Sequence, residues 1–269
     1  MSIFIDILIG KRELSPPNLS HDIQPLNQWD DGIWTGVLQR FVSNNGSVDY
    51  VGLREDTDFI RLVELVGRQS PQSHPTLFPS QNAVLSFWIN AYNLLTIWSV
   101  LSDNISNSIQ ESTASGWIRI NAQQDFFVAN RVQIGGVWMN LYDLENKIIR
   151  HIGDGRIHAA INCASNSCPM LENTAFQPDS LNERLSKSMK RMINSSRHLK
   201  VNMTTQTVYA SPIFDWYKSD FNARGRQQLF AYWIQFADEP LLSSLHQANT
   251  ERFNIKWIPY DWGLNQRKN

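Results

Sequence analysis

Hydrophobic residues three and four positions apart predict a largely helical chain. This spacing recurs in residues 34–41, 59–66, 180–194 and 222–238. Residues 81–101 are apolar on nearly all sides, which is typical of a central, buried helix. Ser80 precedes this segment and is a suitable N-cap, because its hydroxyl can accept a hydrogen bond from the first helical turn.

Strand patterns are fewer and shorter. Residues 117–138 predict a hairpin or two short strands before Gly135-Gly136, and residues 201–209 alternate as a strand does. The apolar run Ile157–Ile161 predicts a short buried strand that carries His158. The expected fold class is α+β, a mostly helical single domain with a small β-sheet.

Proline-rich residues 1–28 predict an extended N-terminal arm. Residues 29–265 show no repeat and no shift in composition that would mark a linker, so we expect one domain there, followed by a short tail at 266–269. The last helix, at 222–238, is expected to lead into an irregular aromatic segment that ends near Tyr260-Asp261-Trp262-Gly263.

Composition limits the class of protein. The chain has 269 residues, of which 42% are hydrophobic and 18% charged, as in globular proteins. The net charge of −1 gives no general reason to expect nucleic acid or an acidic membrane surface as a partner. The apolar stretch Phe87–Leu101 is interrupted by polar residues, so we expect no membrane span.

The N-terminal segment lacks the features of a secretory signal. No basic residue precedes its apolar run, and Asp6 interrupts that run. We therefore expect a cytoplasmic protein whose two cysteines are reduced thiols. Export would instead permit a disulfide between these two cysteines, since a five-residue separation can close a small loop.

Residues 156–170, RIHAAINCASNSCPM, hold the strongest candidate for chemistry. They carry both cysteines and His158 at the spacing His-x4-Cys-x4-Cys. Cys168 precedes Pro169, a residue favoured at the first position of a helix. A thiol at a helix N-terminus has a lowered pKa, so Cys168 is the candidate nucleophile, and the alternative is a small buried residue that closes a loop.

Three further side chains could complete such a site. His158 is a candidate general base, or else a buried imidazole bonded to a backbone carbonyl. Glu145 lies beside the apolar face of a helix expected to run from its cap at Asn140 to His151. It could orient His158, or pair with an arginine such as Arg150 or Arg156.

Asn90 and Asn93 lie three residues apart on one face of the central helix. A buried amide must find partners for its donors and its acceptor, so both are expected to bind loop backbone, for example that of residues 162–169. The alternative is a catalytic role, in which the side-chain amide of Asn90 binds the oxyanion of a reaction intermediate.

Six segments of the chain, in this order, resemble the family called "domain of unknown function 547". They are Gly46–Tyr50, Phe87–Asn93 (FWINAYN), Leu141–Arg150, His158–Pro169, Ser211–Tyr217 with Asp220-Phe221, and Tyr260–Asn265. The resemblance extends over residues 29–265 and implies no particular reaction. Many members of this family look exported, and plant relatives carry an added coiled coil; this chain shows neither a clear signal nor heptads.

The residues favour a cysteine-dependent hydrolase or acyltransferase with Cys168 as nucleophile, His158 as base, Glu145 as orienter and Asn90 near the oxyanion. Its ligand would be a small molecule or a peptide. The alternative is a non-catalytic binding or scaffold module in which these motifs stabilise the fold. A third hypothesis is thiol redox chemistry, in which Cys163 resolves Cys168 and the two sulfurs must come within bonding distance.

Other ligands find little support in the sequence. His158, Cys163 and Cys168 are too loosely spaced for an ordinary structural zinc site. There is no phosphate-binding glycine loop or dinucleotide motif, so no cofactor is expected. The basic run from Arg184 to Lys200 is expected to be the solvated face of the 180–194 helix, although an acidic partner or a phosphate would also fit it.

Overall fold

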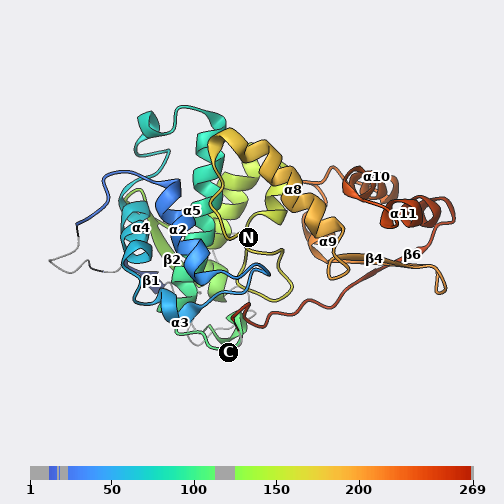
Figure 1. Ribbon diagram of the computed structural model, residues 1–269, viewed down its shortest axis with the longest axis horizontal. Coiled ribbons are helices and arrows are strands. Elements are labelled where there is room, and N and C mark those ends of the chain that lie inside the picture. The colour runs from blue at the N-terminus through green and yellow to red at the C-terminus, as the bar shows by residue number, and fades with distance from the viewer. Residues whose placement is uncertain (1–11, 17, 19–23, 113–124, 268–269) are drawn as a thin grey trace, which may run out of the picture. The chain divides into compact units, whose positions relative to one another are not determined.

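The computed structural model describes residues 12–16, 18, 24–112 and 125–267 (Figure 1). The chain forms two compact units, each assembled from separate stretches of sequence. The first unit comprises Met1–Ile152, Ile161–Leu181 and Trp262–Asn269, and the second comprises Gly153–Ala160 and Asn182–Asp261. Most of the predicted arm at 1–28 lies outside the described residues.

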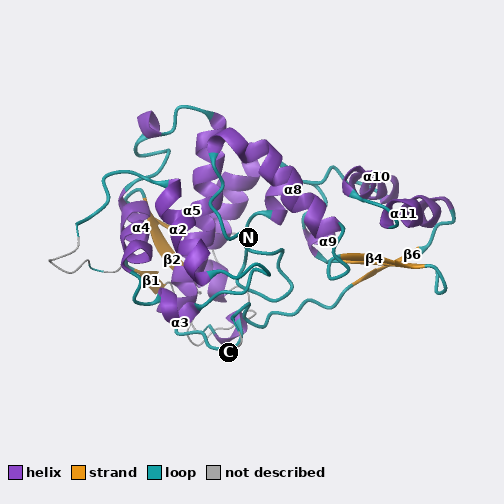
Figure 2. Ribbon diagram, viewed as in Figure 1, coloured by secondary structure: helices purple, strands orange, loops and turns teal. Residues whose placement is uncertain are grey.

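The first unit is mainly helical (Figure 2). Its α-helices are α2 (Asp31–Phe41), α3 (Tyr50–Leu53), α4 (Thr57–Arg68), α5 (Gln81–Ser102) and α7 (Leu141–Asp143). A π-helix (Leu144–Ile149) and a 3₁₀ helix (Arg150–Ile152) continue α7, and further 3₁₀ turns lie at Pro75–Leu77, Ile109–Glu111 and Pro178–Ser180. A short π-helical turn (Asp125–Ala129) precedes the first hairpin strand.

Helix α5 is the centre of the first unit. Nearly every residue from Leu85 to Leu101 is buried, as its all-round apolar sequence predicts. The Ser80 side chain accepts a hydrogen bond from the Ala83 N–H, which confirms the predicted N-cap. By length and composition α5 could cross a membrane, but 89% of its apolar window is buried inside the structure, as in the core helix of a globular protein.

A small sheet flanks these helices in the order β1-β2-β3. Strand β1 (Arg12–Leu14) pairs in parallel with β2 (Asn130–Ile134), and β2 pairs antiparallel with β3 (Val137–Asn140). A hairpin is present, as predicted, but it lies later in the chain: its strands flank Gly135-Gly136, and residues 125–129 form a π-helical turn. Residues 117–124 of the predicted segment lie outside the described residues. In the hairpin turn, Gly135 has φ +58°, and a Cβ there would lie 2.4 Å from the Ser70 hydroxyl oxygen, so the tight approach requires glycine.

The second unit joins α8 (Leu181–Ile193) to a second three-stranded sheet. This sheet has the order β4-β5-β6, with an antiparallel β4–β5 pair and a parallel β5–β6 pair. The elements are β4 (Leu199–Asn202), β5 (Thr207–Ala210), α9 (Ile213–Trp216), α10 (Arg226–Phe236), α11 (Leu241–Thr250) and β6 (Asn254–Trp257). Aromatic side chains such as Phe214, Phe230 and Trp233 fill its core.

The α+β class is confirmed, but three local predictions are wrong. Ile157–Ile161 is not a strand: His158 lies on a 3₁₀ helix (Gly155–Ala159), because the Asp154 side chain accepts from the Arg156 N–H and caps a turn there. Residues 201–209 span parts of two paired strands, β4 and β5, rather than one strand. The segment expected to be irregular after the 222–238 helix contains both α11 and β6.

Candidate functional site

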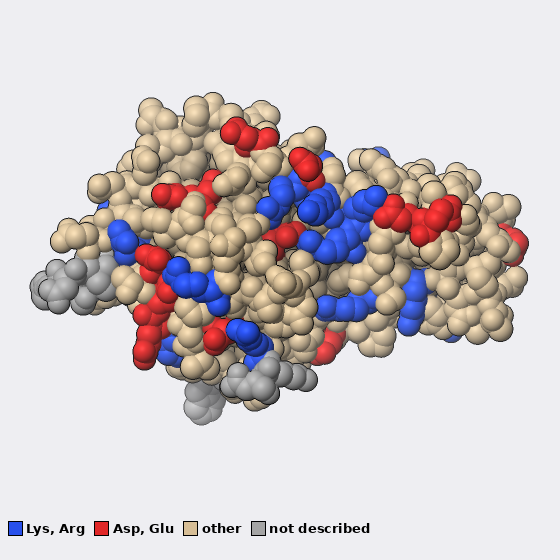
Figure 3. All heavy atoms as spheres, viewed as in Figure 1, with Lys and Arg blue, Asp and Glu red and all other residues tan. Residues whose placement is uncertain are grey.

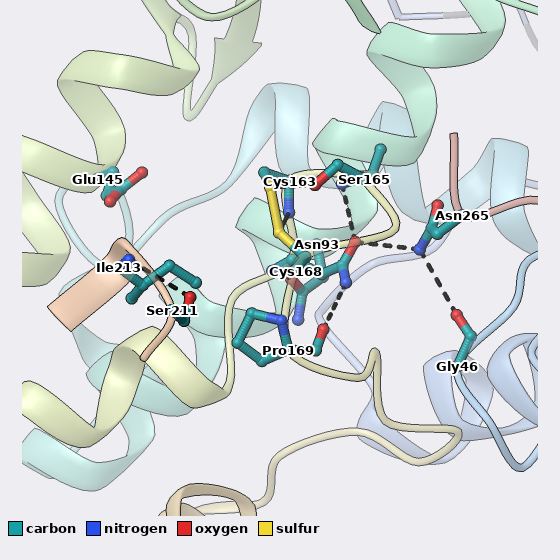
Figure 4. The surroundings of a disulfide bond; sticks show 12 residues. Gly46, Asn93, Glu145, Cys163, Ser165, Cys168, Pro169, Ser211, Ile213 and Asn265 are labelled. Carbon is teal, nitrogen blue, oxygen red and sulfur yellow. Dashed lines mark hydrogen bonds between the residues drawn. A yellow bond between two sulfur atoms is a disulfide. The ribbon is translucent and has the colours of Figure 1, made fainter. Parts of the chain in front are cut away.

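The two cysteines of the chain form a disulfide bond, Cys163–Cys168, with 6.2 Å between their Cα atoms (Figure 4). The expectation of reduced thiols is therefore wrong for this structure. Cys168 is only 5% exposed, whereas Cys163 is partly exposed. The two sulfurs thus meet the distance requirement of the redox hypothesis.

The loop closed by this disulfide ends in a turn, in which the Cys168 N–H donates to the Ser165 carbonyl at 3.1 Å. The turn was one of the two expected settings for Cys168; the other, a helix that starts at Pro169, is wrong, because no helix begins there. Two contacts reach the sulfurs. The Cys163 N–H donates to Cys168 Sγ at 2.9 Å, and the Ser165 hydroxyl lies 3.2 Å from Cys163 Sγ.

Buried asparagines hold both ends of the disulfide loop (Figure 4). Asn93 Oδ1 accepts from the Asn162 N–H at 2.8 Å, which confirms that an amide of the central helix binds the backbone of the 162–169 loop. The Asn162 side chain then spans the loop itself. Its Oδ1 accepts from the Ala164 N–H and its Nδ2 donates to the Pro169 carbonyl, both at 2.8 Å.

Asn265, near the C-terminus, extends this network. Its Nδ2 donates to Asn162 Oδ1 at 3.2 Å and approaches the Gly46 carbonyl at 3.5 Å (Figure 4). Its Oδ1 accepts from the Tyr50 hydroxyl at 2.7 Å, and its N–H donates to the Ala164 carbonyl. Burial raises the pKa of Tyr50, so this hydroxyl stays a donor. Segments distant in sequence thus meet at one loop.

Asn162 and Asn265 are site residues that the residue-by-residue reasoning misses. Both lie inside segments that resemble the family, at His158–Pro169 and Tyr260–Asn265. Their position inside these segments was the one feature of the sequence that could have identified them as site residues. Their partners are backbone groups and other amides, which no local spacing reveals.

The side chain of Asn90 forms two hydrogen bonds with the backbone of Phe176. Its Nδ2 donates to the Phe176 carbonyl at 2.8 Å, and its Oδ1 accepts from the Phe176 N–H at 3.0 Å. Nδ2 also reaches Asp31 Oδ1 at 3.3 Å. These bonds use both amide hydrogens of a side chain that is 1% exposed, which matches the expected binding of loop backbone.

Glu145 is buried, at 8% exposure, on the π-helix Leu144–Ile149. Its Oε2 accepts from the Tyr92 hydroxyl of α5 at 3.2 Å. Tyr92 was not among the expected partners. Of the two arginines considered, Arg156 pairs with Asp154 and Arg150 bonds Asn146.

His158 is 3% exposed in the second unit. Its Nε2 lies 2.9 Å from Asp220 Oδ2, and its ring stacks on Tyr217 with centroids 3.9 Å apart. Phe221 meets the same ring edge-on. The partner that orients His158 is therefore the carboxylate of Asp220, another residue that only the family-like segments signalled.

The predicted site residues thus divide between the two units. Cys168, Glu145 and Asn90 belong to the first unit and His158 to the second. Within its own unit, each has the bonded partners described above. Among the described residues, no three His, Cys, Asp or Glu side chains gather as a metal site requires.

The basic run lies on α8, the turn after it and the start of β4. Figure 3 shows Lys and Arg side chains gathered over α8. Lys187 and Lys190 are exposed, and Lys190 pairs with Asp238 at 2.8 Å. This agrees with a solvated helix face.

Comparison with known protein families gives a match for part of the chain. Residues 78–193 match the model of a family described as "Protein of unknown function, DUF547". This range contains α5, the hairpin, the disulfide loop and all of α8. No curated protein and no solved structure matches the chain. Residues 78–193 of this chain are therefore similar to the DUF547 family of proteins of unknown function, which supports the resemblance noted in the sequence.

Proposed function

We propose that Cys163 and Cys168 form a redox-active pair and that the protein acts by thiol–disulfide exchange. One observation carries the proposal: the sulfurs are bonded within a loop whose ends are held by other means. The hydrogen bonds of Asn93, Asn162 and Asn265 do not involve the sulfur atoms, so they hold the loop independently of the disulfide.

This arrangement bears on both directions of exchange. When the disulfide is reduced, the amide network still holds the backbone on either side of the loop. The two thiols then stay close, so the disulfide can re-form without a search through open conformations. Each sulfur also has a polar neighbour, the Cys163 N–H or the Ser165 hydroxyl, that can stabilise a thiolate.

The predicted compartment fits this proposal. In the cytoplasm, protein disulfides are usually transient and take part in catalysis or redox sensing. In exported proteins a disulfide of this kind is usually structural. We propose this cytoplasmic location together with the redox role.

The hydrolase or acyltransferase hypothesis requires Cys168 as a thiolate. In the oxidised protein this sulfur is bonded to Cys163, and Pro169 has no N–H to offer an oxyanion. The hypothesis therefore stays a prediction for the reduced protein. It can be tested by hydrolysis of a p-nitrophenyl ester with and without reductant.

The decisive experiment equilibrates the protein in glutathione buffers of graded redox ratio. Free thiols are alkylated with iodoacetamide and counted by mass spectrometry, while circular dichroism follows the fold. We expect thiols to appear as the buffer becomes reducing, with the native spectrum retained. Thiols that appear only when the protein unfolds would contradict the proposal.

A double variant, Cys163→Ser with Cys168→Ser, is the matched control. It should fold, because the amide network remains, and lose about 2 kcal/mol of unfolding free energy for a loop this short. It should take up no alkylating reagent and exchange no disulfide with glutathione.

The second candidate is a non-catalytic scaffold or binding module. It is favoured by the burial of Asn90 and Glu145 and by their hydrogen bonds to Phe176 and Tyr92, which engage these side chains within the fold. If the disulfide resists reduction in the native protein, the scaffold function becomes the better explanation, with a peptide or small-molecule ligand still to be found.

A further inference from the structure

We infer that Cys163 is the sulfur attacked by a small monothiol and that Cys168 is the leaving group. The inference rests on the proposed thiol–disulfide exchange and names its substrate class and order of attack. It reverses the expectation from sequence that Cys168 is the more reactive cysteine.

Access distinguishes the two cysteines. A thiolate must reach the sulfur it attacks along a free line of approach, so access decides which sulfur of a disulfide reacts. Cys163 is partly exposed, whereas Cys168 is 5% exposed. The attack therefore falls on Cys163.

The leaving group is stabilised from within the loop. The Cys163 backbone N–H donates to Cys168 Sγ at 2.9 Å. A sulfur that leaves as a thiolate keeps this donor, and charge makes the hydrogen bond stronger. Burial of Cys168 opposes the charge, and the N–H bond offsets part of that cost.

The exchange proceeds in two balanced steps. First, a thiolate RS⁻ attacks Cys163 Sγ, the disulfide breaks, and the products are a Cys163–SR mixed disulfide and the Cys168 thiolate, which takes a proton from water. Second, another RS⁻ attacks the sulfur of the R group, which releases RSSR and the Cys163 thiolate. Two electrons pass from the two thiols to the protein. The Ser165 hydroxyl, 3.2 Å from Cys163 Sγ, is placed to stabilise that final thiolate.

A small thiol suits the surroundings of the loop better than a protein dithiol. The Asn166 N–H donates to the Gly263 carbonyl at 2.7 Å, and Ser165 forms an antiparallel bridge with Leu264. The backbone edge beside the loop is therefore already paired. An extended protein partner would need such an edge to lie along, and a tripeptide thiol such as glutathione does not.

The test uses the unmodified, oxidised protein and reduced glutathione. Samples are quenched with acid at early times, remaining thiols are alkylated, and the tryptic peptide 157–184, which carries both cysteines, is fragmented. We expect about tenfold more glutathione on Cys163 than on Cys168, with the alkyl group on Cys168. Equal labelling, or more glutathione on Cys168, would overturn the assignment.

Two single variants give an independent measurement with glutathione disulfide. Cys168→Ser leaves Cys163 as the only thiol and should form a mixed disulfide rapidly, whereas Cys163→Ser should react about tenfold more slowly. Melting curves identify any variant that fails to fold, and the quench experiment needs no variant. If the native disulfide is not reduced at all, the proposed function fails. If it is reduced but the glutathione sits on Cys168, only the order of attack fails.

Discussion

The side chain of Asn90 pairs with the backbone of Phe176 as one strand pairs with another. Its amide donates to the Phe176 carbonyl at 2.8 Å and accepts from the Phe176 N–H at 3.0 Å. The pair ties the central helix α5 to a segment 86 residues away, where an unsatisfied peptide group would be costly.

Asn90→Leu should therefore destabilise the protein. The leucine would leave a buried N–H and a buried carbonyl of Phe176 without these partners, at a cost of about 1–3 kcal/mol. Urea denaturation measures the change in unfolding free energy. Asn82→Ala is a suitable control on the same helix, because its single bond to the Pro178 carbonyl is exposed and its loss should change little. If the two substitutions changed the unfolding free energy equally, the hydrogen bonds between Asn90 and Phe176 would contribute no more to stability than an exposed one.

Asn162→Ala should loosen the disulfide loop. It removes the side-chain bonds to the Ala164 N–H and the Pro169 carbonyl, and that from Asn265. We expect a loss of about 1–3 kcal/mol and, in the reduced protein, slower re-formation of the disulfide, because the thiols are no longer held together. The rate is measured by oxidising the reduced variant and the reduced parent, stopping samples at intervals and counting the remaining free thiols. An unchanged rate would mean that the amide network does not position the thiols.

Asp220→Leu should destabilise the second unit. His158 is buried, and the substitution would leave its Nε2 without the carboxylate at 2.9 Å, at a cost of about 1–3 kcal/mol. Asp220→Asn keeps an oxygen acceptor and should cost less. Ser219→Ala is the matched control, because it removes only an exposed hydroxyl bond to the same carboxylate. If Asp220→Leu melts like the parent, the His158–Asp220 contact is not a structural bond.

Stability should fall in mild acid because of His198. Burial and the nearby Arg197 lower the pKa of His198 to about 4. Between pH 6.5 and about 4 the unfolded chain binds a proton that the folded protein does not, so unfolding becomes easier as the pH falls. The contribution is a few kcal/mol at most, since one pKa unit corresponds to about 1.4 kcal/mol.

The measurement compares unfolding free energies of the parent and of His198→Gln across this pH range. The variant cannot be protonated at this position, so its stability should decline less steeply. Parallel pH profiles would show that His198 is not responsible.

Periodic patterns determined most of the helices. The all-round apolar run at 81–101 became α5, and the amphipathic spacing at 180–194 became α8, because side-chain periodicity decides which face of a helix is buried. The short apolar run at 157–161 was ambiguous, since five residues fit a strand or a turn of helix equally well. The Asp154 cap settled it as a 3₁₀ helix.

The sequence by itself also marked the residues of the candidate site, in the segments 87–93, 158–169 and 260–265. It could not pair them. The five-residue spacing of Cys163 and Cys168 allowed a disulfide but did not require one. The partner of Glu145 and the carbonyl that Asn90 binds are decided by contacts between residues 53 and 86 positions apart in the chain. Such contacts depend on how whole helices and loops pack together, so they cannot be predicted from the residues next to Asn90 or Glu145 in the sequence. Tertiary structure alone therefore turned a suspected free nucleophile into one half of a disulfide held by buried amides.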